Sequence, residues 1–338
     1  MKLIKTEEAV GHVLCHDMTQ IIPGKYKGAR FQKGHVVTEE DIPVLLSMGK
    51  ENIYIFEMDK NMLHENDAAE LLCKLCKGEN LTRSSVKEGK IELNAAIDGL
   101  FVLDTERLNA VNSVDEIMVA TRKGYTAVNK GDKVAGTRVI PLIIEKAKLE
   151  TAQAAAGKEP LMRVIPYTLK TAAIITTGSE VYHKRIEDRF TPVLIEKLKA
   201  YGIEVTERIL TDDNINNIKD AIEQVRGKTD MILCTGGMSV DPDDNTPGAI
   251  KATVADVVTY GAPVLPGAMF LLGYYEDGTP VMGLPGCVMY AKATIFDLVL
   301  PRIAAGVRMK KADFVQFGEG GLCLGCERCT YPHCPFGK

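Results

Sequence analysis

The C-terminal half of this 338-residue chain predicts an α/β fold: a three-layer, doubly wound, mostly parallel sheet. Two observations lead to this prediction. Between residues 170 and 307, short apolar segments alternate with stretches of helical character at the spacing typical of successive β-α units. The segment Met231–Thr235 is apolar almost throughout, as expected for a strand that is buried on both faces of a parallel sheet.

The same pattern gives the order of the elements in this half. We expect strands at 171–176, 204–210 and 231–235, followed by two paired strands at 269–275 and 280–283. Helices are expected at 186–201, 215–225, 247–253 and 288–305. Thr246 is expected to be the N-cap of the third helix, with Pro247 at its first position.

Residues 1–160 predict smaller, β-rich α+β subdomains. A glycine-punctuated loop or hairpin is expected at 24–34, and a helix is expected from Thr38, its cap, to Gly49. The Ala-rich, charged stretch 144–158 predicts a helical connector, so the domain boundary is placed there. The α/β domain is assigned to 168–307 and a cysteine-rich tail to 308–338.

Composition and charge exclude several classes of function. The net charge of −4 argues against binding of nucleic acid, which depends on basic patches. No apolar run is long enough to cross a membrane, and the first residues do not have the pattern of a secretory signal. Nine cysteines without an export signal indicate reduced thiols or metal ligands, and therefore a cytoplasmic protein.

Glycines and acids gather in four turns that follow the expected strands. Parallel strands bring such turns to one edge of a sheet, where ligands bind in open α/β folds. Glycine lets backbone amides approach an anion, and carboxylates can hold a divalent cation, so a site for phosphate and metal is predicted. The alternative for Asp212 and Asp213 is that they cap the following helix. The turns are Thr176–Glu180, Thr211–Asn214, Thr235–Asp244 and Gly283–Cys287.

These motifs, in this order, resemble the molybdopterin-binding domain, and most closely the molybdenum-insertion enzymes of the gephyrin E-domain type. The resemblance covers about residues 168–307. It rests on the 177–180 turn, the acid pair, the 235–240 turn, Pro266–Gly267 and Leu284–Gly286. The loop Asp243–Thr246 is also similar to loops of competence-damage-inducible proteins and molybdopterin adenylyltransferases.

The resemblance implies that adenylylated molybdopterin and molybdate bind, that Mg²⁺ assists cleavage of the phosphoanhydride, and that molybdenum enters the dithiolene. It also implies a homodimer. Catalytic roles would fall to Glu180, Asp212 and Asp244, and metal binding to Asp213 and Asp244. The residues that would contact the cofactor are Thr177, Gly178, Gly236, Gly237, Ser239, Pro285 and Gly286.

Three departures from the family pattern keep other functions open. Ala268 stands where the family has a lysine, Ser179 replaces an acid, and Cys287 replaces an asparagine. The missing lysine and the added cysteine tail favour a molybdopterin-binding carrier or redox-sensing accessory protein without turnover; the Asp243–Thr246 loop favours a nucleotide hydrolase. Cys287 is either a thiol whose pKa is lowered at a helix N-terminus or a small residue that fills the asparagine's place.

The tail contains a C-x2-C-x2-C-x4-C-P run, formed by Cys323, Cys326, Cys329 and Cys334. It resembles the cysteine run of bacterial ferredoxins with one extra residue, and so favours an iron–sulfur cluster. Zinc, with four cysteines or with three and His333, is the alternative. Such a site could report redox state or dock a molybdoenzyme. Cys73 and Cys76, in contrast, are expected to pack in a helix.

Overall fold

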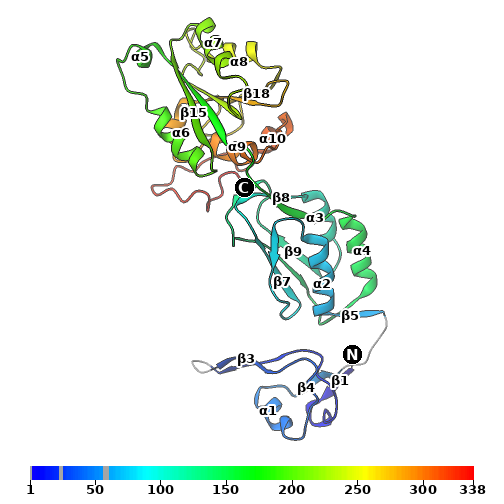
Figure 1. Ribbon diagram of the computed structural model, residues 1–338. Coiled ribbons are helices and arrows are strands. Elements are labelled where there is room, and N and C mark those ends of the chain that lie inside the picture. The colour runs from blue at the N-terminus through cyan, green and yellow to red at the C-terminus, as the bar shows by residue number, and fades with distance from the viewer. Residues whose placement is uncertain (1, 23–25, 56–60) are drawn as a thin grey trace. The chain divides into compact units, whose positions relative to one another are not determined.

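The computed structural model describes residues 2–22, 26–55 and 61–338 (Figure 1). The chain divides into two compact units. The first comprises Met1–Ile97, Leu103–Gly124 and Lys130–Val164, and the second comprises Asp98–Val102, Tyr125–Asn129 and Ile165–Lys338. Within the described part of the chain, no helix is long and apolar enough to cross a membrane.

The first unit begins with a small β-rich part. Strand β1 (Lys2–Lys5) pairs with β4 (Asn52–Ile55), and β2 (Met18–Ile22) pairs antiparallel with β3 (Tyr26–Phe31). The loop or hairpin expected at 24–34 is thus mostly a single strand, and Gly24 lies outside the described residues. The remaining elements here are the 3₁₀ helix η1 (Thr6–Glu8) and helix α1 (Asp41–Ser47).

Helix α1 is shorter than predicted, because its N-cap position is Glu40 and not Thr38. Thr38 does not cap the helix; its backbone N–H and hydroxyl donate to the Asp41 carboxylate at 2.9 and 2.8 Å. The prediction that the helix stops at Gly49 holds to within two residues, and this glycine adopts a φ of +72°.

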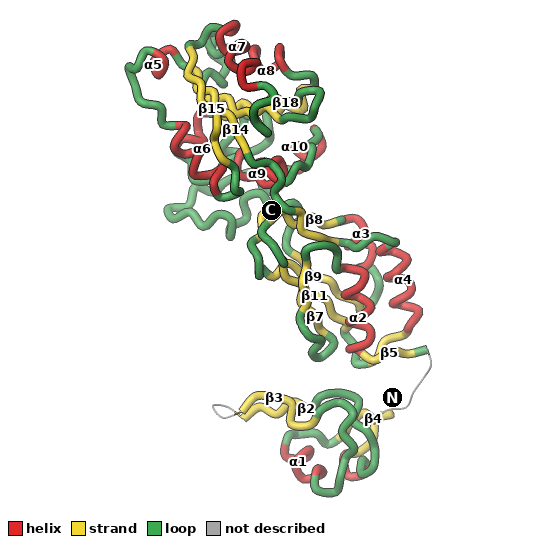
Figure 2. The backbone as a smooth tube through the Cα atoms, in the orientation of Figure 1, coloured by secondary structure: helices red, strands yellow, loops and turns green. Residues whose placement is uncertain are grey.

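The rest of the first unit is a four-stranded antiparallel sheet with helices packed on it (Figure 2). Its strand order is β6 (Leu81–Arg83), β7 (Lys90–Ala95), β11 (Lys133–Val139) and β9 (Ile117–Thr121). Helix α2 (Glu65–Cys76) packs on β7 and β11, and α3 (Thr105–Asn112) packs on β9. Strands β5 (Met62–His64) and β12 (Ile143–Glu145) pair antiparallel, and β13 (Met162–Ile165) follows α4 (Lys146–Ala156).

Helix α4 is the stretch expected as a connector. It packs against α3 and α2, with Leu149 and Ala152 buried, so it is a structural helix of the first unit. The division between the units follows Val164. In α2, Cys73 and Cys76 are buried, which confirms their predicted packing.

The second unit is built on a six-stranded sheet, and the predicted doubly wound fold is confirmed. Strands β14, β15, β16 and β19 are parallel, whereas β18 runs antiparallel to both β19 and β17. Sequence reasoning missed the edge strand β17. The order is β15 (Glu204–Thr211), β14 (Thr171–Thr177), β16 (Met231–Thr235), β19 (Pro280–Leu284), β18 (Leu271–Tyr274) and β17 (Asp256–Tyr260).

Alternate side chains of the sheet feed two separate cores, which gives three layers. Ile174 of β14 joins the core beneath α6 (Phe190–Lys199), α9 (Ile295–Ala304) and α10 (Lys311–Gln316). The next residue, Ile175, joins the opposite core beneath α7 (Ile215–Val225) and α8 (Thr246–Thr253). This unit also contains the antiparallel pair of β8 (Gly99–Leu103) and β10 (Thr126–Val128).

Three helices begin at other residues than predicted, and two of these starts are fixed by side chains that bind backbone N–H groups. Helix α6 begins only at Phe190, where the Asp188 carboxylate accepts the Phe190 and Thr191 N–H groups at 2.9 and 3.1 Å. The predicted last helix is two elements, η2 (Gly286–Met289) and α9, whose start is fixed by a capping box between Thr294 and Asp297. The N-cap of α8 is Asn245, so Thr246 is the first helical residue.

Two carboxylates hold elements of this unit in place. Asp230 accepts the backbone N–H groups of Lys170 and Thr171, at 2.6 and 2.8 Å, where β14 begins. Burial acts to raise the pKa of Asp230, but these hydrogen bonds and one from the Thr171 hydroxyl lower it overall. Asp297 pairs with the ammonium of Lys197, and both side chains are largely buried.

Candidate functional site

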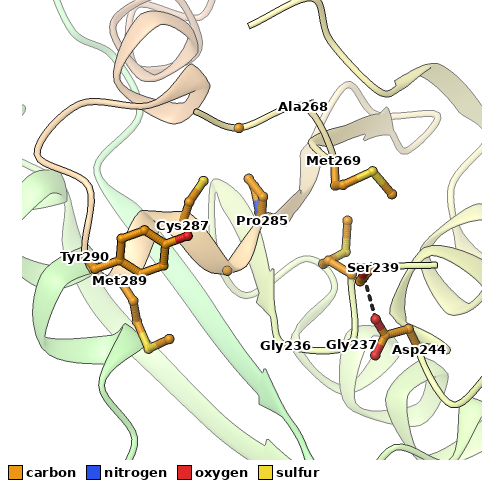
Figure 3. A pocket seen from close by; sticks show the side chains of 13 residues that line it. Gly236, Gly237, Ser239, Asp244, Ala268, Met269, Pro285, Cys287, Met289 and Tyr290 are labelled. Atoms are coloured by element: carbon orange, nitrogen blue, oxygen red, sulfur yellow. Dashed lines mark hydrogen bonds between the residues drawn. The ribbon is translucent and has the colours of Figure 1, made fainter. Parts of the chain in front are cut away.

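A crevice of about 460 Å³ lies at the carboxyl ends of β16 and β19. Three segments line it: the turn after β16, the 267–269 segment, and the β19–η2 turn. Figure 3 shows Tyr290 and Cys287 on one side of Pro285, with Ser239 and Asp244 on the other. The lining residues are Gly236, Gly237, Met238, Ser239, Asp244, Gly267, Ala268, Met269, Pro285, Gly286, Cys287, Met289 and Tyr290.

The Gly236–Gly237 turn requires glycine for two reasons. Both residues have positive φ angles, +87° and +52°, which side chains disfavour. A Cβ on Gly236 would also lie 2.2 Å from the Thr177 carbonyl oxygen, inside contact distance. The chain can therefore turn tightly over the end of β14 and present bare backbone to the crevice.

Gly286, on the facing wall, is glycine for no such structural reason. A Cβ there would meet no atom within 4 Å, and its φ lies outside the left-handed region. Any side chain at this position would project into open space beside Pro285. A ligand in the crevice could therefore approach the backbone of the β19–η2 turn closely.

Asp244 supplies the single carboxylate that lines the crevice among the described residues. Its Oδ2 accepts the backbone N–H of Ser239 at 2.6 Å, and this bond closes the loop that follows the two glycines (Figure 3). The Thr235 hydroxyl, buried just before the turn, has no hydrogen-bond partner within the described structure. The loop thus holds one free carboxylate oxygen and one unsatisfied hydroxyl near the glycines.

The turns after β14 and β15 are hydrogen-bonded to the crevice loop and its flanking residues, but they do not line the crevice. Thr177 is buried, and its hydroxyl hydrogen-bonds that of Thr246 at 3.0 Å. Asp213 accepts the Ser179 N–H through its carboxylate, and its carbonyl accepts from the Asn245 side chain at 2.9 Å. Three of the four predicted turns are therefore hydrogen-bonded to one another at one edge of the sheet.

Three other predicted site residues also lie outside the lining. Gly178 donates its N–H to the Thr211 carbonyl at 3.2 Å. Glu180 is exposed on α5 (Ser179–Tyr182). Asp212 accepts from the Asn214 N–H and the Asn217 side chain at 3.0 and 2.9 Å. The N-cap of α7 is Asn214 and not Asp212, so Asp212 supports the cap rather than forming it.

The crevice contains no fixed positive charge. None of its lining residues is lysine or arginine. Ala268, which stands where the family pattern has a lysine, is one of the lining residues. Nor do three His, Cys, Asp or Glu side chains gather as a metal site anywhere in the described residues. A bound Mg²⁺ would have to take its further ligands from the substrate and water, as Mg²⁺ commonly does in phosphate sites.

Cys287 does not have the environment of an activated thiol. It belongs to η2, a single 3₁₀ turn, and burial raises the pKa of its thiol. The lowered pKa considered from the sequence is therefore wrong, because loss of hydration outweighs the favourable effect of the backbone. The structure fits the other interpretation, a small side chain in the crevice wall.

Sequence reasoning missed the apolar and aromatic part of the lining. Met238, Met289 and Tyr290 all line the crevice, and the side chain of Tyr290 is 77% exposed. The Tyr260 hydroxyl donates to the Met238 carbonyl at 3.2 Å, and burial followed by the nearby Asp244 raises its pKa. No spacing rule marks these residues; their position next to the Gly-Gly and Pro-Gly motifs is the signal that could have found them.

The four tail cysteines lie elsewhere in the second unit. Cys323 and Cys334 are partly buried against the core beneath α9, whereas Cys326 and Cys329 are exposed. His333 lies beside Cys334 and donates its backbone N–H to Thr330.

Comparison with known families matches two parts of the chain. Residues 173–305 match a model described as "Probable molybdopterin binding domain", and residues 3–57 match a domain of unknown function. A competence-damage inducible protein of Bacillus thuringiensis is 33% identical over 94 residues, which is 28% of this chain and 23% of that protein. A CinA-like protein of Pseudothermotoga lettingae is 37% identical over 86 residues, 25% and 21% respectively. The chain thus spans less than a quarter of the length of these relatives.

Among solved structures, the molybdopterin biosynthesis enzyme MoaB of Thermus thermophilus is 21% identical, with a TM-score of 0.35, and the match covers 41% of this chain and 98% of that one. The tungsten cofactor synthesizing protein MoaB of Pyrococcus furiosus is 18% identical, with a TM-score of 0.35, covering 43% and 99%. On the strength of the family match, residues 173–305 belong to the molybdopterin-binding domain family.

Proposed function

We propose that the second unit binds a phosphate-bearing molybdopterin in the crevice and acts in molybdenum-cofactor biosynthesis. The observation that carries this proposal is the pair of glycine turns that face each other across a cavity of about 460 Å³. That volume is within the usual range for small-molecule sites. Backbone exposed at Gly236, Gly237 and Gly286 suits a phosphate, because amide groups can approach it without a side chain between them.

The pterin ring is assigned to the opposite end of the crevice. Tyr290 offers an exposed aromatic ring, and Met289 precedes it as the last residue of η2. A planar heterocycle gains stacking energy on such a ring while its edges stay hydrated. The phosphate would then lie toward Ser239 and Asp244, and a Mg²⁺ could bridge it to the free oxygen of Asp244.

The finer proposal is that adenylylated molybdopterin is cleaved here, with release of AMP, as molybdenum is inserted. Mg²⁺ held by Asp244 would stabilise the charge that develops on the leaving phosphate. In this proposal Asp213 would support the crevice loop through its hydrogen bonds. Asp212 and Glu180 would act from outside the crevice lining. The lack of a cationic side chain in the crevice favours the alternative, a carrier that binds the pterin without turnover.

A second candidate, nucleotide hydrolysis, is favoured by the similarity to competence-damage inducible proteins. It uses the same crevice, because the loop that resembles those proteins includes Asp244. The substrate distinguishes nucleotide hydrolysis from the molybdopterin function. A hydrolase would cleave nucleoside diphosphate compounds in the absence of any pterin.

The test is an anaerobic titration of the full chain with molybdopterin and with its adenylylated form. Binding is monitored by the fluorescence of the pterin. Gly286→Leu should reduce affinity at least tenfold, because a Cβ at this position meets no atom within 4 Å and the larger side chain would compete with a ligand at the crevice wall. Gly286→Ala is the matched control, and its affinity should be much closer to that of the wild type. Equal affinity of wild type and Gly286→Leu for both ligands would refute this site.

Turnover is then measured as AMP release in the presence of Mg²⁺ and molybdate. Release that is lost in Asp244→Asn supports insertion, whereas tight binding with no release supports the carrier. Hydrolysis of nucleotides with no pterin binding would support the second candidate and overturn the first.

A further inference from the structure

The four-cysteine run is the strongest chemical signal that the crevice does not use. Its first three cysteines are spaced C-x2-C-x2-C, so that the central one belongs to both short spacings. Iron–sulfur proteins use this spacing, because the ligands attach to different iron atoms of one cluster. Zinc sites instead combine separate pairs of ligands around a single ion.

Both ends of this run are fixed to the second unit, next to each other. Gly337 donates its N–H to the Gly320 carbonyl at 2.9 Å, which closes residues 320–337 into a loop. Cys323 and Cys334 each lie three residues inside that closure, and both pack partly buried against the same core. The fold therefore brings the first and last cysteines of the run into one region of the surface.

The middle of the loop is unconstrained. Residues 324–329 form no helix or strand, and no hydrogen bond between described residues holds them. Cys326 and Cys329 are exposed, and the apolar side chain of Leu324 is 69% exposed. The thiols are not gathered in this conformation, so binding would require only this free stretch to fold over the two anchored cysteines.

The loop is also attached to the wall of the crevice. Cys323 donates its N–H to the Leu265 carbonyl, and Leu265 donates to the Gly321 carbonyl, both at 2.8 Å. Leu265 is followed by Pro266 and then by Gly267, which lines the crevice. At the other end of the loop, the Tyr331 hydroxyl donates to the Asp297 carbonyl at 3.0 Å.

We propose that Cys323, Cys326, Cys329 and Cys334 ligate one iron–sulfur cluster on this loop, beside the segment that forms the crevice wall. Each thiol exchanges its proton for a bond to iron, with no change in the oxidation state of the cysteine sulfur. Iron and inorganic sulfide are the co-reactants. The proposal goes beyond the proposed function and does not depend on it, since the cluster can form without any pterin.

The test is anaerobic reconstitution of the full chain with iron and sulfide. Iron and acid-labile sulfide should bind in equal amounts, at a fixed ratio to protein, with the broad visible absorption of a thiolate-bound cluster. The double variant Cys326→Ser/Cys329→Ser should lose at least nine-tenths of this iron. It should melt as the wild type does, because both side chains are exposed. Cys73→Ala/Cys76→Ala, which removes the other C-x2-C pair, is the matched control and should keep its iron.

Alkylation followed by peptide mass spectrometry gives a readout that does not depend on any variant. The four tail thiols of the wild type should be protected after reconstitution and reactive before it. Stoichiometric zinc with no iron uptake would overturn the cluster in favour of a zinc site. Iron retained by the serine double variant, or no metal bound at all, would overturn the proposal. Pterin binding is measured separately, so failure of the crevice assignment leaves this result unaffected.

Discussion

Replacement of Gly236 by alanine tests whether the crevice depends on the close contact between two strand ends. The new Cβ would lie 2.2 Å from the Thr177 carbonyl oxygen and 2.8 Å from the Thr177 hydroxyl. The backbone at this residue has a φ of +87°, in the left-handed region. Both effects act on the folded state, so Gly236→Ala should destabilise the second unit.

The size of the effect follows from these two terms. A non-glycine residue in the left-handed region costs about 1–2 kcal/mol. Forcing the turn away from β14 costs about 1–3 kcal/mol more, as in an overpacked core. A loss near the middle of the combined range, about 3.5 kcal/mol, lowers the melting temperature by about 7–14 °C in a unit of this size.

The assay is differential scanning calorimetry of the full chain, with hydrogen exchange of peptides from β14 and β16 to assign the transition. Gly286→Ala is the matched control, because its Cβ meets no atom within 4 Å; its stability should change by less than about 0.5 kcal/mol. If Gly236→Ala had the same melting temperature as the control, glycine would not be required where the turn approaches Thr177.

Three further outcomes follow from side chains described above. Asp297→Ala removes the capping box of α9 and leaves the buried ammonium of Lys197 without its partner, so calorimetry should show a loss of about 2–4 kcal/mol. Asp230→Asn should cost about 1 kcal/mol at neutral pH after allowance for solvent screening. Because the pKa of Asp230 is lowered in the folded state, the stability difference between wild type and Asp230→Asn should be complete above the ordinary carboxyl pKa. It should vanish as the pH falls through the pKa of the folded state. Urea unfolding at several pH values measures this difference. Cys287 should be alkylated slowly at neutral pH, with a rate that still rises above the ordinary thiol pKa; rapid reaction at pH 7, detected on its peptide, would contradict its burial.

The sheet of the second unit could be predicted because its central strands are apolar on both faces. Met231–Thr235 is fully buried, and so short an apolar run before a Gly-Gly turn favours a strand over a helix. The edge strand β17 could not, because Asp256 and Val257 are exposed and the segment lacks clear alternation. Helix starts were misplaced where a carboxylate such as Asp188 binds backbone at a point that no apolar pattern marks.

The candidate crevice was predictable where backbone turns form its wall. Gly236, Gly237, Pro285 and Gly286 all line the crevice, as expected from motifs whose position relative to strands is fixed. The acids were harder, because a carboxylate in a turn can serve either a ligand or the nearest N–H. Asp212 binds its own helix, and only Asp244 reaches the crevice. That choice is set by local geometry, which residue type alone does not determine.

The second unit is not continuous in sequence. Its residues Asp98–Val102 and Tyr125–Asn129 are separated from the remainder by stretches of the first unit. The Tyr167 hydroxyl donates to the Gly99 carbonyl at 2.9 Å, and the Arg302 guanidinium lies 4.6 Å from the centre of the Tyr125 ring. A fragment that starts at Ile165 would lose both partners. A gene segment that encodes the whole second unit would therefore also have to encode the stretches of the first unit that lie between its parts, which is most of the chain.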